Sequence, residues 1–107
     1  TLKIDVVVHI SHNDSDNYRL IAALFRDSGA SAVAVGQSIN VSYPGYGTCI
    51  AFTHYMSAGS TALTTFEVRV GGDRNEGLVT FNGDNGTRKY GGTLASSITI
   101  TEVGSQF

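Results

Sequence analysis

The sequence predicts an all-β protein, a two-sheet antiparallel sandwich of the jelly-roll type. Two observations lead to this prediction. Apolar and polar residues alternate with a period of two along much of the chain, as they do in half-buried strands. Turn-forming residues recur at intervals of roughly 8 to 12 residues, a spacing typical of β-sandwiches and barrels. With 107 residues, the chain is expected to form a single domain, residues 1–107, around one core.

The first predicted strand covers residues 2–10. Its even-numbered residues are all apolar, whereas Lys3, Asp5 and His9 occupy odd-numbered positions. Because successive side chains of a strand point to opposite faces, one face of this strand is expected to cover a core. The polar run at 12–17 then predicts a loop.

Residues 18–26 form the second predicted strand, which is apolar on both faces and is therefore expected to lie between two layers. A helix is the alternative, because residues 20–24 also have good helical propensity. The strand is favoured because Arg26-Asp27-Ser28-Gly29 can close it as a hairpin turn. Two short strands are expected next, at 32–36 and 39–43. They are followed by a loop at 43–47, which contains the only proline.

The C-terminal half predicts further strands at 48–57, 63–70, 78–81 and 94–103, with a tight hairpin at 82–86. In the first of these, Ile50, Phe52, His54 and Met56 share one face, and Cys49, Ala51, Thr53 and Tyr55 share the other. Both faces of this strand therefore carry apolar residues. One face can be buried against the second sheet, and the other is then expected to be buried against a neighbouring chain. In the later strands, Phe66, Val68 and Val70 are expected on the inner face, and Ile98 and Ile100 are expected to share one face.

The composition argues against several function classes. Charged residues make up 15% of the chain and the net charge is −2, so there is no basic field for nucleic acid. No apolar run approaches the roughly 20 residues that cross a bilayer, so no membrane insertion is expected. The low charge favours a chain that hides surface in a homo-oligomer. The alternative is a monomer coated with Ser and Thr.

No constellation of residues predicts catalysis, and the protein is expected not to be an enzyme. The sequence contains no Gly-x-Ser-x-Gly, and its acidic residues are not placed as a glycosidase pair. Cys49 lies among apolar neighbours, where a cysteine usually behaves as a small hydrophobic residue.

No metal site or cofactor is expected either. Residues 13–17 resemble a calcium loop but lack the glycine and the closing glutamate of an EF-hand, which favours a polar turn. The other candidate ligands are His9, His12 and His54, and their spacing matches no metal motif.

Three stretches carry a family resemblance: residues 24–29 (LFRDSG), residues 49–55 with 63–70 (CIAFTHY and LTTFEVRV), and residues 82–103, which end in SSITITEV. Over 18–103 the chain resembles the C-terminal domains of bacteriophage tail-fibre, head-fibre and other virion surface proteins. Those domains are similar to the trimeric jelly rolls of the tumour-necrosis-factor and complement globular-head superfamily. Because the chain starts at Thr1 without a leader, we expect either a cleaved segment or the C-terminal part of a longer virion protein.

The resemblance implies a homotrimer on the virion surface, with aromatic strand residues packed at the threefold axis. It supplies no catalytic residues. The implied partners are further copies of the chain, other virion proteins and a host surface glycan. The residues expected at the trimer interface are Phe52, His54, Tyr55 and Phe66.

The polar loops are the candidate receptor-binding region, because loops on a rigid β-scaffold often carry binding. Their amide, carboxylate and guanidinium groups suit sugar hydroxyls, and tyrosine rings can stack on a sugar face. The alternative is that they are solvated turns with a purely structural role. The candidates are Tyr43, Tyr46, Asp73, Arg74, Asn75, Asp84, Asn85, Arg88 and Tyr90.

Three other functions stay open. A capsid cement or decoration protein would use the same jelly roll together with an extended N-terminal arm. A carbohydrate-binding module would be a monomer with exposed coplanar aromatic residues, which the absence of tryptophan disfavours. A cytokine-like ligand has no support from a signal sequence or a disulfide.

Overall fold

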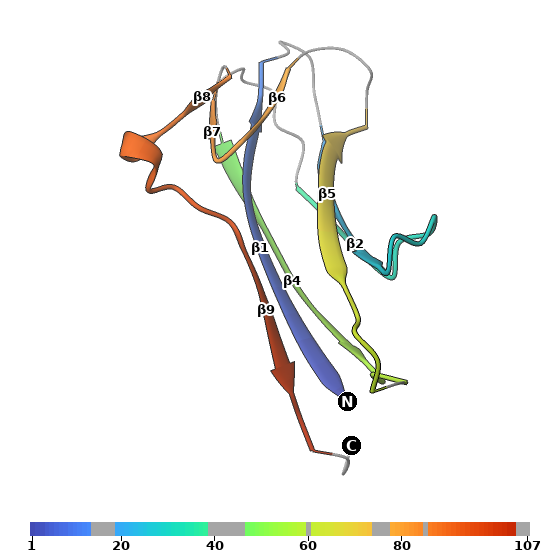
Figure 1. The fold of residues 1–107 in the computed structure, drawn as a ribbon. Helices are drawn as coiled ribbons and strands as arrows, with labels where there is room; N and C mark the ends of the chain where they lie inside the picture. Colours follow the sequence, from blue (N-terminus) through green and yellow to red (C-terminus); the bar gives the residue numbers. More distant parts are fainter. Residues whose placement is uncertain (14–18, 39–46, 60, 74–77, 85, 105–107) are drawn as a thin grey trace.

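The computed structural model describes residues 1–13, 19–38, 47–59, 61–73, 78–84 and 86–104. Within this part of the chain the fold is all-β, apart from one short 3-10 turn, and the strand pairs are antiparallel (Figure 1). The strands are β1 Leu2–His12, β2 Leu20–Arg26, β3 Ala34–Gln37, β4 Gly47–Met56, β5 Phe66–Gly72, β6 Val79–Phe81, β7 Gly83–Asp84, β8 Thr87–Arg88 and β9 Ser97–Glu102, and the 3-10 turn is η1 Tyr90–Gly92.

The first sheet is built around β1, which is paired on both sides. On one side β4 pairs along nearly its whole length, from Leu2↔Met56 to Ser11↔Gly47. On the other side β9 pairs with the first half of β1 and β6 pairs with its last three residues. The strand extends to His12, two residues beyond the prediction, because Ser11 and His12 are buried and pair with β6.

The second sheet has the order β3-β2-β5, and β7 and β8 form a separate hairpin. The chain changes sheet between β1 and β2, between β3 and β4, between β4 and β5, and between β5 and β6. These crossings place consecutive segments of the chain in opposite layers, which makes the fold an antiparallel β-sandwich.

The core lies between the inner faces of the two sheets. It consists of alternate residues of β1 and β2 together with one residue of β4, and each fully buried Leu, Ile or Val contributes roughly 1.5–3 kcal/mol to stability. The predicted alternation of the first strand is confirmed. The buried core residues are Ile4, Val6, Val8, Ile10, Leu20, Ala22, Leu24 and Ile50.

The segment with two predicted alternatives is a strand. After β2 the chain turns at Asp27 and Ser28, and the Gly29 N–H donates to the Arg26 carbonyl at 3.0 Å. Both central residues have positive φ, 52° and 60°, which is the feature of type I′ hairpin turns. The turn starts the reversal of the chain, and pairing with β3 follows after residues 29–33, from Leu24↔Ala34 onward.

Replacing Ser28 with glycine is expected to raise the free energy of unfolding by about 0.5 kcal/mol. The left-handed conformation costs a residue with a Cβ about 1 kcal/mol, and glycine removes this cost. Glycine also has more conformational freedom in the unfolded chain, which cancels about half of the stabilisation. Urea denaturation measures the difference. Ser31→Gly, at a position without positive φ, serves as the control and should lower stability. A decrease in both variants would contradict the prediction.

Several predicted strand positions need correction. β2 does not lie between two layers: its inner face is buried, and on its outer face the Arg69 guanidinium carbon lies 4.1 Å from the centroid of the Phe25 ring. β5 begins at Phe66, because Leu63 lies outside the ladder and is 94% exposed. β9 begins at Ser97 rather than at residue 94. The predicted strand at 39–43 and most of the predicted loops at 12–17 and 43–47 lie outside the described residues.

Candidate functional site

The two long sides of the sandwich differ. On the side formed by β3 and β4 the sheets are in close contact at Gly36. A Cβ atom at this glycine would lie 2.7 Å from Phe52 Cδ1 and 2.9 Å from Ile50 Cγ2. The missing side chain therefore lets β3 approach β4 and closes this side.

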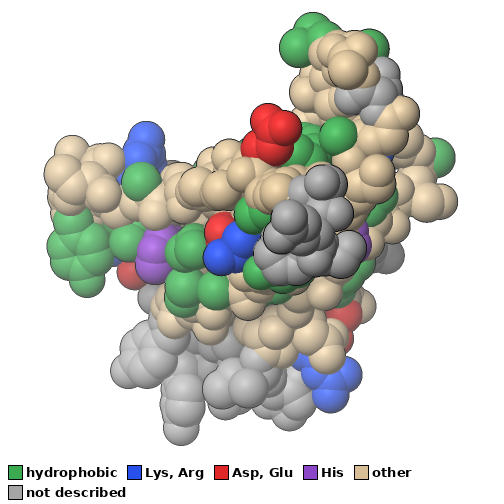
Figure 2. Space-filling view, turned by 90° about the horizontal axis from the view of Figure 1, so that it is seen from below, with side chains coloured by type: hydrophobic (Ala, Val, Ile, Leu, Met, Phe, Trp, Pro, Cys, Tyr) green, Lys and Arg blue, Asp and Glu red, His purple; other side chains and the backbone are tan. Residues whose placement is uncertain are grey.

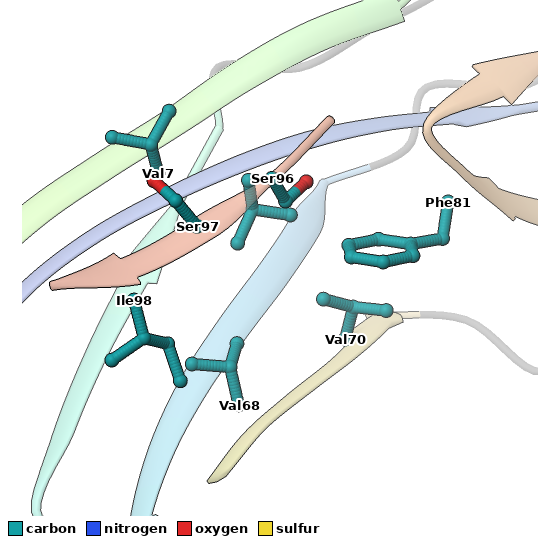
Figure 3. Close-up of a pocket in the computed structure, with 8 residues that line it drawn as sticks. Val7, Val68, Val70, Phe81, Ser96, Ser97 and Ile98 are labelled. Atoms are coloured by element: carbon teal, nitrogen blue, oxygen red, sulfur yellow. The ribbon is translucent and has the colours of Figure 1, made fainter. Parts of the chain in front are cut away.

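The opposite side is open. Here a cleft of about 350 Å³ separates β5 from β6 and β9. Figure 3 shows Ile98 of β9 and Val68 of β5 pointing toward one another, with Phe81 of β6 next to Val70. No lining residue carries a charge, so the cleft suits an apolar occupant. The lining residues are Val7, Val8, Val68, Val70, Phe81, Ser96, Ser97 and Ile98.

Two side chains of the cleft lining, Phe81 and Ile98, belong to the inner face of the first sheet, as does Ile100 further along β9. Phe81, Ile98 and Ile100 are register partners of Ile10, Val6 and Ile4, which are at most 1% exposed. Yet these three residues are 48%, 38% and 48% exposed. Side chains on a core face are normally covered by the opposite sheet. Within the described residues, the second sheet ends at β5 and leaves them partly in water.

The sequence alone did not identify this site. It placed Ile98 and Ile100 on one face of a strand, and the structure confirms that shared face. Whether the face is covered depends on how far the opposite sheet extends, which alternation does not encode. For Phe81 we find no signal in the sequence.

The four residues predicted at a trimer interface do not share one surface. Phe52 and Phe66 pack against the core from the inner faces of β4 and β5. His54 is half-buried opposite Ile4, on the inner face of β4. Tyr55 alone points from the outer face of β4 and is exposed.

The outer face of the first sheet is polar and nearly neutral. Thr53 Oγ1 donates to Asp5 Oδ1 at 2.6 Å, and Lys3 Nζ lies 3.9 Å from the other carboxylate oxygen of Asp5. The two charges on this part of the face therefore offset one another. Figure 2, a view from below that of Figure 1, shows a few charged side chains of both signs on the face that it displays.

Cys49 lies on this outer face and is exposed, so the prediction of a packed small hydrophobic residue was wrong. The apolar residues that suggested packing, Ile50 and Phe52, point to the other face of β4. Cys49 and its cross-strand partner His9 line a second hollow with Tyr90. Among the described residues, no group of three His, Cys, Asp or Glu side chains gathers to hold a metal ion.

Four of the predicted receptor-binding residues fall in the described part of the chain. The Arg19 N–H donates to Asp73 Oδ1 at 3.1 Å, so this carboxylate ties β2 to the end of β5. Asp84 pairs with Lys89 at 3.1 Å, and an Arg88 Nη donates to the Gly92 carbonyl at 2.9 Å. These three side chains therefore have local structural partners, and Tyr90 is exposed. The remaining candidates, Tyr43, Tyr46, Arg74, Asn75 and Asn85, lie outside the described residues.

Comparison with known protein families, with curated proteins and with solved structures gave no match. Among the described residues, no helix could span a membrane, because none is long and apolar enough.

Proposed function

We propose that this chain is a self-associating structural domain without enzymatic activity, the homotrimeric jelly-roll head of a phage fibre or spike on the virion surface. The observation that carries the proposal is the open side of the sandwich. There Phe81, Ile98 and Ile100 lie on a core face but remain partly exposed. A neighbouring copy of the chain would complete their burial.

The free energy of apolar burial favours contact with a neighbouring copy at these side chains. Full burial of one large apolar side chain is worth roughly 1.5–3 kcal/mol, so completing the burial of three half-covered ones offers about 2–4 kcal/mol per contact. Val68 and Val70, on the opposite wall of the cleft, add to this. Association also costs translational and rotational entropy, and several contacts closed into a ring share that cost.

The virion assignment and the threefold symmetry are supported by the sequence resemblance over 18–103 and by the low charge of the chain. In this proposal the other partners are further virion proteins and a host surface glycan. The glycan would contact loops at the ends of the sandwich, where Tyr90 offers an exposed ring.

Sedimentation equilibrium at low micromolar concentration tests the proposal. The expected result is a single species of three times the 11.3 kDa mass of one chain. Dilution should dissociate it without unfolding, which far-UV circular dichroism can monitor. A stable 11.3 kDa monomer at all accessible concentrations would overturn the proposal and favour a monomeric carbohydrate-binding module.

A further inference from the structure

We infer that the open cleft of one protomer receives the free edge of β4 from the next, so that copies associate head to tail. This inference rests on the proposed self-association and names the two surfaces that meet. The first surface is the cleft between β5 and β9. The second is the closed side of the sandwich, with β4 at its border.

The edge of β4 lacks the features that normally protect an edge strand. Among the described strands, β4 pairs only with β1, so within the described residues no strand pairs with the other edge of Gly47–Met56. Edge strands of monomeric proteins usually carry charged residues or proline, which prevent pairing with another chain. The sequence of β4, GTCIAFTHYM, contains no Lys, Arg, Asp, Glu or Pro.

The two surfaces are both uncharged, and only the first of them is hollow. Neither the cleft lining nor β4 contains a charged residue, so no ion would be buried when they meet. The cleft is hollow, whereas the side at Gly36 and Phe52 is closed. If two protomers met through their clefts, the two hollows would face each other and stay unfilled. If they met through their β4 edges, Ile98 and Phe81 would stay in contact with water. Both surfaces are covered only when the β4 edge of one protomer enters the cleft of the other.

The strand directions are compatible with a ring. β4 and β9 are both antiparallel to β1 and therefore run parallel to each other. A β4 strand from the next protomer can continue the sheet beyond β9 if the copies are related by rotation about an axis along the strands. Such a head-to-tail contact closes into a ring when the rotation closes, as in a trimer, and otherwise gives an open filament.

Mixing two variants tests this arrangement. Ile98→Lys places an ammonium group in the cleft, and His54→Lys places one on the inner face of β4, so the two altered surfaces also repel each other. Each variant blocks one half of every contact, so each alone should be monomeric, with association weakened at least about 100-fold. The mixture retains one intact cleft and one intact edge. It should form a 1:1 complex of twice the mass of one chain and nothing larger.

Neighbouring residues on the same strands supply matched controls. Thr99→Lys and Tyr55→Lys introduce the same charge on the outer face, one residue away, and should keep the mass of the unaltered protein. Circular dichroism verifies folding of each variant. Ile100→Lys and Met56→Lys replace Ile98→Lys and His54→Lys if either of those fails to fold.

The outcomes separate this inference from the proposed function. If the unaltered protein is oligomeric but the two monomeric variants do not combine, the head-to-tail contact is wrong and self-association stands. If Tyr55→Lys dissociates the oligomer and His54→Lys does not, the contact lies on the outer face of β4 and the inference is overturned. If the unaltered protein is monomeric, the proposed function fails first.

Discussion

Replacing Gly83 with alanine is expected to lower the free energy of unfolding by about 3 kcal/mol. A Cβ atom at this position would lie 1.9 Å from the Thr87 carbonyl oxygen and 2.8 Å from the Cα of Arg88. Both are backbone atoms, which cannot move away by a change of rotamer. The strands β7 and β8 would therefore have to separate, and the hairpin that they form would be lost.

The displacement would also affect the first sheet. The Ser11 hydroxyl, fully buried in β1, donates to the Gly83 carbonyl at 2.6 Å. A buried hydroxyl left without its partner costs about 1–3 kcal/mol. This hydrogen bond connects the hairpin directly to β1, so the substitution should weaken both the hairpin and its contact with the first sheet.

Urea denaturation measures this effect, and Gly71→Ala provides the matched control. A Cβ at Gly71 would meet no atom within 4 Å, and its φ is not positive. The control should change stability by no more than about 0.5 kcal/mol. Equal stability of the two variants would show that Gly83 does not approach β8 as closely as described.

Leu24→Ala is expected to destabilise the fold by about 2–5 kcal/mol. Leu24 lies in the middle strand of the second sheet, is completely buried, and has Val68 and Ala34 as its register partners. Because β2 has a strand on each side, the surrounding side chains cannot easily collapse into the cavity that the truncation leaves. The loss should therefore lie in the upper half of that range.

The same denaturation experiment on Ile21→Ala gives the comparison. Ile21 is in the same strand but on its outer face, where it is half-buried. Its truncation should lower the free energy of unfolding by about 1 kcal/mol, because the Ile21 side chain has less buried apolar surface to lose than that of Leu24. A cost for Ile21→Ala as large as that for Leu24→Ala would mean that the outer face of the second sheet is also a buried layer.

The sequence predicted the fold class well because alternation directly reports which face of a strand is covered. Ile4, Val6 and Val8 illustrate this, and the turn at Asp27 and Ser28 correctly favoured a strand over a helix. Strand ends were less predictable. Leu63 has the apolar character of a strand residue, but a strand begins where backbone pairing begins, and pairing here starts at Phe66.

The candidate site could be predicted only in part. Alternation grouped Cys49 with Ala51 and Tyr55, and Ile98 with Ile100, but it could not show what lies over each of these faces. That depends on the number of strands in the facing sheet, a long-range property. For this reason Cys49 was expected to be packed and is exposed, and the open side of the sandwich was recognised only in three dimensions.

The central position of β1 also affects how the chain acquires its structure. Among the described strands, the first in sequence pairs with the last, through Leu2↔Glu102, and with β4 near the middle of the described residues. Bringing such distant segments together costs loop-closure entropy before any contact repays it, so folding is expected on the millisecond-to-second timescale rather than in microseconds. During synthesis β1 emerges well before β4 and β9, so both of its edges lack their partner strands until those segments have been made. The early chain is therefore the stage at which aggregation competes most strongly with folding.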